Sequence, residues 1–273
     1  FHIGHLMSNA IGETIARLHE AVGAKVLRVN YQGDVGMHVA KAVYATGDYV
    51  AGNKAFETDP TAKAEIEAIN KKIYDRSDLE INKLYDQGRK ASLEYFEKQY
   101  ERLGTKFVHY FFESEMAPIG LELIKQYPDI FVESQGATVF HGEHTRVFIN
   151  SQGLPTYEAK ELGLNKTKFE TYHPDLSIIV TANEIKAYFE VLMEAMAKIM
   201  PDVAAKTRHI PHGMMKLPTG KMSSRTGDVI TADDFIEQGK AKTGSEETAI
   251  GAIKYSILKQ GIGNDIVFDF EKS

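Results

Sequence analysis

The sequence contains no cysteine, and this absence removes several kinds of site at once. A disulfide framework, a thiolate-bound metal centre and a cysteine nucleophile are all excluded for these 273 residues. Any metal ion should therefore be a hard cation held by oxygen, such as the Mg²⁺ that accompanies phosphate groups. We predict no metal-binding residues and no bound structural metal.

A long apolar run and an excess of basic charge are also missing. No stretch is long enough to span a bilayer and no basic, apolar leader is present, so we expect a cytoplasmic protein without membrane contact. The 38 acidic residues outnumber the 32 basic ones, which argues against a small nucleic-acid-binding module. A large enzyme could still bind RNA through a local basic face.

The composition, 43% hydrophobic and 26% charged, suffices for one large domain with an insertion or for two units. Apolar residues at helical spacing predict a helix over Leu6 to Val22, and a short apolar strand follows at Val26 to Val29. A helix followed by a short buried strand favours an α/β fold with a doubly wound parallel sheet.

Residues 46–106 have the character of a charged helical insertion. Asp59-Pro60 is typical of a helix start, and Ser77-Asp78-Leu79-Glu80 has the pattern of a capping box for a helix that runs towards Leu103. Because residues 213–228 are rich in Gly, Ser and Lys, we predict a loop there. Further strands are expected at 107–112, 138–140, 146–149 and 177–180, and further helices at 157–163, 184–199, 232–240 and 246–259.

His2-Ile3-Gly4-His5 is the first of two motifs that indicate chemistry. The two imidazoles lie three residues apart on one face of a helical turn, and the free N–H groups of a helix start favour a phosphate. Gly4 would let the backbone approach a nucleotide closely. These features suit phosphoryl chemistry, in which positioning and charge stabilisation dominate. The tetrad alone is equally consistent with histidines that cap a helix.

Gly220-Lys221-Met222-Ser223-Ser224-Arg225-Thr226-Gly227 is the second motif, a cationic loop rich in hydroxyl groups. Its Lys and Arg charges, with Ser hydroxyls and backbone donors, can hold a triphosphate. Such a segment is also a common kind of solvated surface loop. The presence of both motifs in this order favours ATP binding by the two together.

The two motifs resemble those of class I aminoacyl-tRNA synthetases, and the chain resembles the arginyl family along nearly its whole length. Asn30-Tyr31-Gln32-Gly33-Asp34-Val35-Gly36 is similar to the family's Asn-Tyr-x-x-Asp-x-Gly stretch. Residues 154–163 resemble the element that holds the substrate side chain, where Tyr157 is followed four residues later by Glu161. The family usually has Asp at the position of Glu161.

The resemblance implies an ATP site built from both motifs. His2 and His5 would stabilise charge on the α-phosphoryl oxygens, and Gly4 would lie beside them. Ser224 stands where many class I synthetases carry a second Lys, which leaves the phosphate charge to Lys221 and Arg225. The other residues expected at the nucleotide are Met222 and Ser223, and His212, Gly213 and Met214, which could line the adenine or pack in the core.

The resemblance also implies an arginine pocket. Tyr157 and Glu161 would bind the side chain of arginine, because a carboxylate matches the rigid fork of a guanidinium. His5 would face the amino acid, and Asn183 would either face it or serve as an N-cap. From spacing alone, Tyr157 and Glu161 are an ordinary half-exposed helix pair. His141-Gly142-Glu143-His144 is interpreted as a hairpin turn.

The implied fold is a Rossmann-type, doubly wound catalytic domain at 1–45 and 107–242, with the insertion at 46–106 and the start of a helical anticodon-binding domain at 243–273. The implied partners are L-arginine, ATP with Mg²⁺, and the arginine tRNA, which family members generally need before they activate arginine; we expect a monomer. The first residue is Phe1, and the family strand that precedes the histidines is not in the sequence. We therefore expect a fragment with an exposed sheet edge that is inactive alone.

Three alternatives remain at this point. Nucleotidylyltransferases share a His-x-Gly-His element but carry their Arg-containing motif much closer to it than Lys221. Another class I synthetase, such as one for cysteine or lysine, is the second; one for cysteine would usually need a zinc site made with Cys. A non-catalytic RNA-binding paralogue is the third, and the retention of both motifs argues against it.

Overall fold

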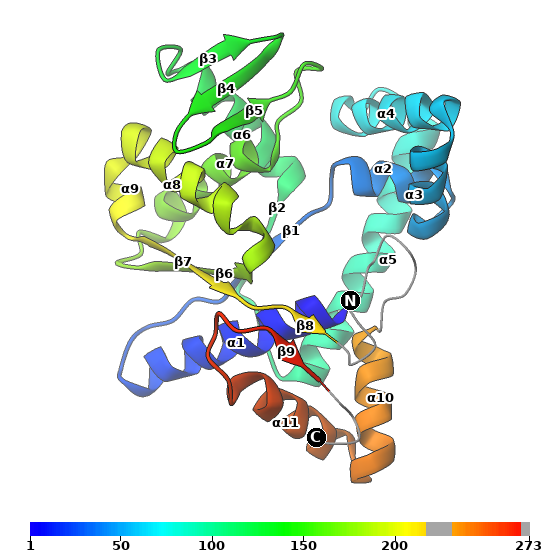
Figure 1. Ribbon diagram of the computed structural model, residues 1–273, viewed down its shortest axis with the longest axis vertical. Coiled ribbons are helices and arrows are strands. Elements are labelled where there is room, and N and C mark those ends of the chain that lie inside the picture. The colour runs from blue at the N-terminus through cyan, green and yellow to red at the C-terminus, as the bar shows by residue number, and fades with distance from the viewer. Residues whose placement is uncertain (217–230, 269–273) are drawn as a thin grey trace.

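The computed structural model describes residues 1–216 and 231–268, and Figure 1 shows how its elements are arranged. The helices are α1 (Ile3–Ala21), α2 (Met37–Tyr44), α3 (Tyr49–Thr58), α4 (Pro60–Asp75), α5 (Leu79–Leu103), α6 (Glu113–Lys125), α7 (Tyr157–Tyr172), α8 (Lys186–Ile199), α9 (Pro201–Ala205), α10 (Ala232–Thr243) and α11 (Glu246–Leu258). The strands are β1 (Val29–Gln32), β2 (His109–Phe112), β3 (Phe131–Ser134), β4 (Ala137–His141), β5 (Thr145–Ile149), β6 (Ser177–Ala182), β7 (Thr207–His212), β8 (Met215–Lys216) and β9 (Ile266–Val267).

The strands form several short sheets. β1 pairs with β2, β6 with β7 and β8 with β9, all in parallel, and β3, β4 and β5 form an antiparallel sheet. The predicted α/β character is confirmed, but the single doubly wound sheet is not among the pairings of the described residues. A cavity of about 780 Å³ is lined by residues of α1, of β1 from the first parallel pair and of β6 from the second.

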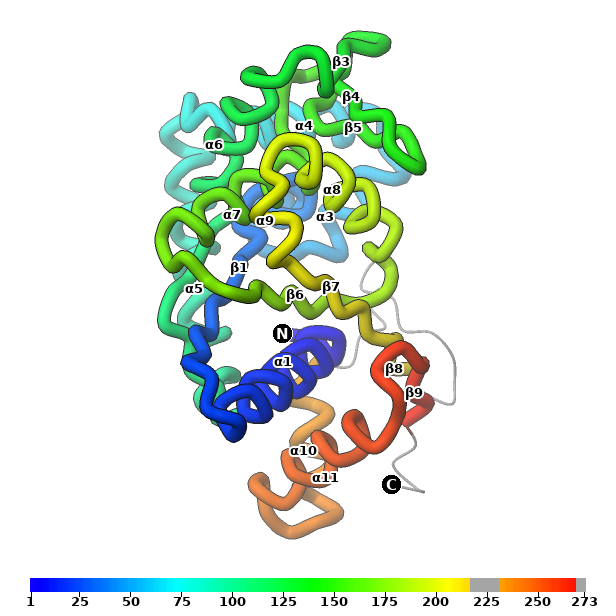
Figure 2. Tube along the Cα trace, turned by 90° about the vertical axis from the view of Figure 1, so that its left-hand side faces the viewer, coloured from blue at the N-terminus to red at the C-terminus, as the bar shows by residue number. Residues whose placement is uncertain are grey.

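Helices cover both faces of the β6–β7 pair, as Figure 2 shows. Ile179 packs into an apolar cluster with α6 to α9, whereas its neighbour Val180 packs into a second cluster with α1, α10 and α11. Successive strand residues point to opposite faces, so β6 joins the two clusters. A third cluster is formed by α2, α4 and α5 with Val35, on the other side of the molecule from α8.

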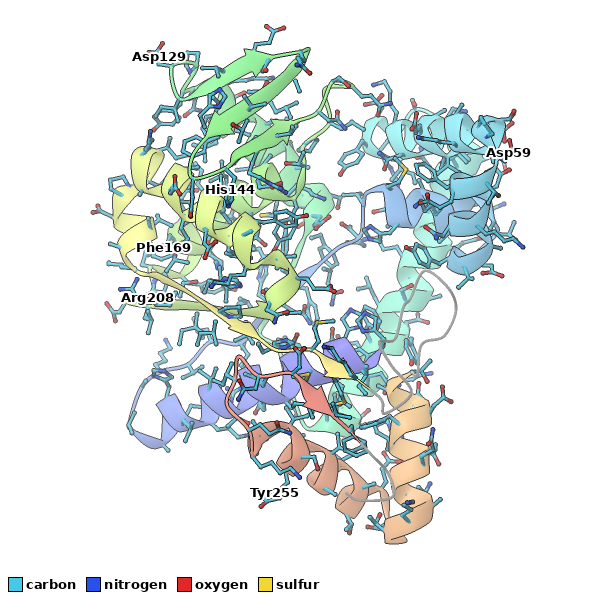
Figure 3. All side chains as sticks on the ribbon, viewed as in Figure 1. Asp59, Asp129, His144, Phe169, Arg208 and Tyr255 are labelled. Carbon is cyan, nitrogen blue, oxygen red and sulfur yellow. The ribbon has the colours of Figure 1, made fainter. Side chains whose placement is uncertain are left out.

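Local sequence explains most helix boundaries. Asp59, labelled in Figure 3, accepts a hydrogen bond from the Thr61 N–H at 2.8 Å and begins α4 as predicted. The cap of α5 is Asp78, which accepts from the N–H groups of residues 80 and 81, so the predicted box with Ser77 as cap is wrong. Gly104 ends α5 at φ 68°, where a residue with a Cβ is disfavoured.

Other boundaries differ from the prediction. The first strand is displaced to Val29–Gln32, and α1 begins at Ile3. α7 continues to Tyr172 instead of ending at Gly163. Gly163 is inside the helix and packs closely against α6, where a Cβ would lie 2.3 Å from the Met116 carbonyl oxygen. The hairpin of β4 and β5 around residues 142–144 is confirmed. None of the helices in the two described ranges is both long and apolar enough to cross a membrane.

Candidate functional site

The first motif forms the N-terminus of α1. His2 is the N-cap: its Nδ1 accepts the Gly4 N–H at 3.0 Å, and the His2 N–H donates to Nδ1 of His5 at 3.1 Å. A Cβ at Gly4 would lie 2.8 Å from the His2 ring, so glycine leaves room for the ring to fold back. The interpretation of a capping histidine is therefore correct for His2, and it leaves the outer edge of each ring available.

The hydrogen bonds also fix the tautomer of both rings. Because each Nδ1 accepts a backbone N–H, a neutral ring carries its proton on Nε2, where it is a donor. The rings of His2 and His5 lie 3.8 Å apart between centroids and stay partly open to solvent. Partial burial disfavours the charged imidazolium and lowers the pKa of both histidines, and the neighbouring His2 lowers the pKa of His5 further. Neutral rings with outward Nε2–H groups suit an anionic ligand.

The second motif, Lys221, Met222, Ser223, Ser224 and Arg225, lies outside the described residues, but residues on either side of it lie beside α1. Thr231 forms an antiparallel bridge with His2, and the Ala232 N–H donates to the Phe1 carbonyl oxygen at 3.0 Å. On the other side, the Ser8 hydroxyl and Nε2 of His212 are 2.8 Å apart. Residues on both sides of the second motif therefore contact residues of the first motif or of α1.

His212, Gly213 and Met214 connect the end of β7 to later parts of the chain. The Gly213 N–H donates to the Ile262 carbonyl oxygen at 2.8 Å, and the Met214 N–H donates to Asp265 at 2.7 Å. A Cβ at Gly213 would lie 2.1 Å from the Asn264 carbonyl oxygen. These three residues have clear packing roles, and their contact with adenine stays a prediction.

Two of the four predicted arginine-binding residues, Tyr157 and Glu161, lie on a polar stripe of α7. Tyr157, Glu161, Asn165 and Lys168 are spaced four, four and three residues apart, which puts them on one helix face. Glu161 is only 1% exposed, and burial together with the charge of Glu161 raises the pKa of Tyr157. The half-exposed position expected from spacing alone is therefore wrong for Glu161, whereas Tyr157 is half-buried. Asn183 is exposed in a 3₁₀ turn, and α8 begins after Ile185, so Asn183 is not its N-cap.

Two lysines and two carboxylates are buried on or beside this stripe. Lys160 and Glu113 form a buried ion pair, and Nζ of Lys168 donates to the Ser177 hydroxyl at 2.9 Å. Burial raises the pKa of Glu161 to about 7 against the lowering effect of Lys168 and Tyr157. Burial likewise lowers the pKa of Lys168 to about 8. Each charge is thus incompletely compensated in this low-dielectric site.

Two buried polar atoms beside Glu161 have no hydrogen-bond partner within the described residues: the Tyr31 hydroxyl and Oδ1 of Asn165. Asn165 uses only its amide group, which donates to the Glu161 carbonyl oxygen at 2.9 Å. Burial and the charge of Glu161 raise the pKa of Tyr31. Buried polar groups without a partner are rare and often mark the place of a ligand.

The sequence reasoning did not assign roles to Glu113, Lys160, Asn165 or Lys168. Glu113 directly follows a predicted strand, and the carboxyl end of a parallel strand is the usual place for a site. Asn165 and Lys168 continue the spacing of Tyr157 and Glu161 along α7. That regular polar spacing was the available signal.

Asp34, in the Asn30–Gly36 stretch, is 8% exposed. Its carboxylate accepts from Nε of Arg89 at 2.8 Å, from the Tyr85 hydroxyl at 3.2 Å, and from the Ser114 N–H and hydroxyl at 2.9 and 2.7 Å. Arg89 and Tyr85 belong to α5 and Ser114 to α6. Asp34 therefore joins β1 to the helical insertion and to the strand end that carries Glu113.

One cavity connects the first motif with two neighbours of Glu161. His5 of the first motif, Tyr31 of β1 and Lys168 of α7 all line the cavity of about 780 Å³. Tyr157, Glu161 and Asn183 are not among its lining residues, so the cavity connects the first motif with Tyr31 and Lys168, two neighbours of Glu161. Over residues 1–216 and 231–268, no group of three or more His, Asp or Glu side chains could hold a metal ion.

The family model described as "tRNA synthetases class I (R), catalytic domain" matches residues 1–270. The chain belongs to this family. The arginine–tRNA ligase of Borreliella burgdorferi is 27% identical, over all of this chain and 55% of the relative. That of Treponema denticola is 28% identical, over all of this chain and 54% of the relative. The chain thus spans about half the length of these curated relatives.

Solved structures share the fold of this family. The arginyl-tRNA synthetase of Plasmodium falciparum matches 99% of this chain and 52% of its own length, with a TM-score of 0.69 at 19% identity. The described residues thus have the mixed helix-and-strand fold of a class I synthetase catalytic domain.

Proposed function

We propose that this protein attaches arginine to its tRNA in two steps with ATP as the energy source. In the first step the arginine carboxylate attacks the α-phosphorus of Mg²⁺-ATP, and pyrophosphate leaves from an arginyl-adenylate. In the second step the terminal 2′-hydroxyl of the tRNA attacks the adenylate carbonyl, and AMP leaves. The observation that supports this most strongly is that Tyr31, whose buried hydroxyl lies near Glu161 without a partner among the described residues, lines the same cavity as His5.

In this proposal ATP lies across the N-terminus of α1. The Nε2–H groups of His2 and His5 donate to the α-phosphoryl oxygens as charge develops there, beside Gly4. The β- and γ-phosphates are assigned to Lys221, Ser223, Ser224 and Arg225, with Met222 alongside, and the adenine to His212, Gly213 and Met214. The bridge between His2 and Thr231 supports this assignment, because it brings the flank of the second motif to the first. Mg²⁺ arrives with ATP as part of the substrate.

The arginine side chain is assigned to the stripe of α7. A guanidinium has five donors in a planar fork, and it finds acceptors in the Glu161 carboxylate, the unpaired Oδ1 of Asn165 and the Tyr31 hydroxyl. Tyr157 orients Glu161, while His5 and Asn183 face the rest of the amino acid. Lysine offers a point charge and cannot satisfy the same acceptors, so it should be strongly discriminated against.

The remaining parts of the proposal follow from the family. We assign residues 1–45 and 107–242 to the catalytic domain, 46–106 to its insertion and 243–273 to the start of an anticodon-binding domain. The reaction belongs to cytoplasmic protein synthesis, with a monomer as the expected state.

The proposal is tested by ATP–pyrophosphate exchange with the natural full-length protein in the presence of arginine tRNA. We expect exchange that depends on arginine and is not supported by lysine. Glu161→Gln should raise the KM for arginine, whereas His5→Asn should lower kcat. Exchange that depends on another amino acid, or none at all, would contradict the proposal.

A further inference from the structure

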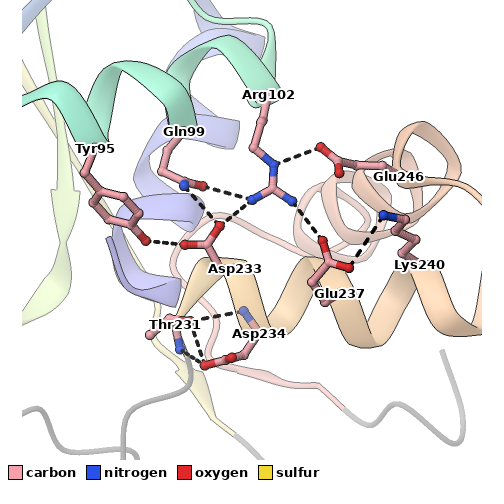
Figure 4. A network of polar contacts seen from close by, with 9 residues as sticks. All are labelled: Tyr95, Gln99, Arg102, Thr231, Asp233, Asp234, Glu237, Lys240 and Glu246. Atoms are coloured by element: carbon pink, nitrogen blue, oxygen red, sulfur yellow. Dashed lines mark hydrogen bonds and ion pairs between the residues drawn. The ribbon is translucent and has the colours of Figure 1, made fainter.

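A single carboxylate, that of Asp233 near the start of α10, receives donors from three residues of the insertion helix α5 (Figure 4). The Tyr95 hydroxyl donates to one oxygen, and the guanidinium of Arg102 and the amide of Gln99 donate to the other, the last at 3.0 Å. The three donors are spaced four and three residues apart and so occupy one face of α5. This face fixes the N-terminus of α10.

The start of α10 is also hydrogen-bonded to the first motif. Thr231 caps α10 and forms the bridge to His2, and the Ala232 N–H donates to Phe1. Asp233 follows these residues directly. A displacement of the first turn of α10 therefore displaces Phe1 and His2 as well.

The same stretch of α5 contacts the first motif directly. The ring of Phe1 lies 5.7 Å from that of Phe96 and 5.8 Å from that of Tyr100, both edge-to-face. The ring of His5 lies 5.9 Å from that of Phe96. The insertion helix α5 thus contacts Phe1, His5 and the start of α10.

We propose that Asp233 is a positioning residue, which couples α5 to α10 and thereby keeps His2 aligned with His5 for the nucleotide. This inference rests on the proposed function, because it assumes that ATP binds at these histidines. Asp233 does not touch the arginine pocket on α7, so its loss should act on the nucleotide and leave arginine binding unchanged. A shift of about 1 Å in a group that positions a substrate can cost on the order of 100-fold in rate.

The test compares Asp233→Ala and Asp233→Asn with the wild type in the full-length protein, by pyrophosphate exchange well below each thermal midpoint. Ala removes all three acceptor contacts, whereas Asn keeps one acceptor oxygen. We expect kcat/KM for ATP to fall roughly 10- to 100-fold in the Ala variant and less in the Asn variant, while the KM for arginine stays within about twofold.

Two controls separate positioning from a general loss of folded protein. Asp86→Ala removes an exposed ion pair with Arg76, 2.8 Å long and remote from α10, and should leave both KM values unchanged. Tyr95→Phe combined with Asp233→Ala should add little to Asp233→Ala alone, because both changes remove the same bond.

The outcomes are distinct. An active wild type with unchanged kcat/KM for ATP in Asp233→Ala would overturn this inference alone. The inference would also be overturned if Asp233→Ala kept the wild-type KM for ATP and lost activity only in proportion to its unfolded fraction. An inactive wild type would overturn the proposed function, and the inference would fall with it.

Discussion

Arginine binding should release a proton from Glu161. This carboxyl is 1% exposed, and burial raises its pKa to about 7, so part of the population holds a proton in the empty pocket near neutral pH. A guanidinium binds the ionised form. Binding must therefore weaken as the pH falls below the pKa of Glu161 and level off above it.

The magnitude follows from the ionised fraction. With a pKa of about 7, roughly one molecule in eleven is ionised at pH 6 and about three in four at pH 7.5. The affinity for arginine should therefore rise about eightfold between these pH values. Lys168 has its pKa lowered to about 8 by burial, so it loses its proton mainly above this window.

Isothermal titration of arginine into the full-length protein measures both the affinity and the number of protons released. In two buffers of different ionisation enthalpy, we expect close to one proton released per arginine at pH 6 and a minority fraction at pH 7.5. Glu161→Gln, the matched control, should bind arginine weakly and without this pH dependence. A pH-independent affinity in the wild type, with no proton released at pH 6, would refute the reasoning about Glu161.

Three further predictions concern stability. Burial raises the pKa of Glu161 from 4.5 to about 7, so the free energy of unfolding should fall by about 3 kcal/mol as the pH rises from 4.5 to 7. Urea unfolding of Glu161→Gln should lack this fall. The same pH dependence of the unfolding free energy in both proteins would contradict the prediction. Gly163→Ala should destabilise the protein by about 1–3 kcal/mol or more, because the new Cβ would lie 2.3 Å from the Met116 carbonyl oxygen. Gly88→Ala, which adds a Cβ in open space on α5, should instead stabilise the protein by roughly 0.5–1 kcal/mol. Equal thermal midpoints for the two variants would contradict this explanation. Asp34→Ala should cost about 2–4 kcal/mol in urea unfolding, because it leaves Arg89, Tyr85 and Ser114 without their shared acceptor, and a cost below about 0.5 kcal/mol would show that the contact is unimportant.

Local patterns in the sequence predicted the elements whose boundaries depend on local physics. The Asp59-Pro60 start of α4 and the Gly104 end of α5 are as expected, because capping involves only neighbouring residues. The length of α7 was not predictable in this way. Gly163 looks like a helix end, and only the close backbone of α6 explains why a glycine is needed inside the helix.

Part of the candidate site was likewise predictable from the sequence. His2 and His5, three residues apart, were found from the motif, and Tyr157 and Glu161 from the resemblance. The burial of Glu161, its buried neighbours Lys168 and Asn165, and the ion pair of Glu113 with Lys160 depend on tertiary packing. The bond between Ala232 and Phe1 joins residues more than 200 positions apart, and no local pattern indicates it.

The central claim is that one ligand spans from the first motif to the stripe of α7. A crystal structure of the full-length protein with a non-hydrolysable arginyl-adenylate analogue tests it most directly. We predict that the phosphate mimic accepts hydrogen bonds from Nε2 of His2 and His5, and that the guanidinium contacts the Glu161 carboxylate. An analogue that binds outside the cavity lined by His5, Tyr31 and Lys168, or whose guanidinium points away from α7, would contradict the claim.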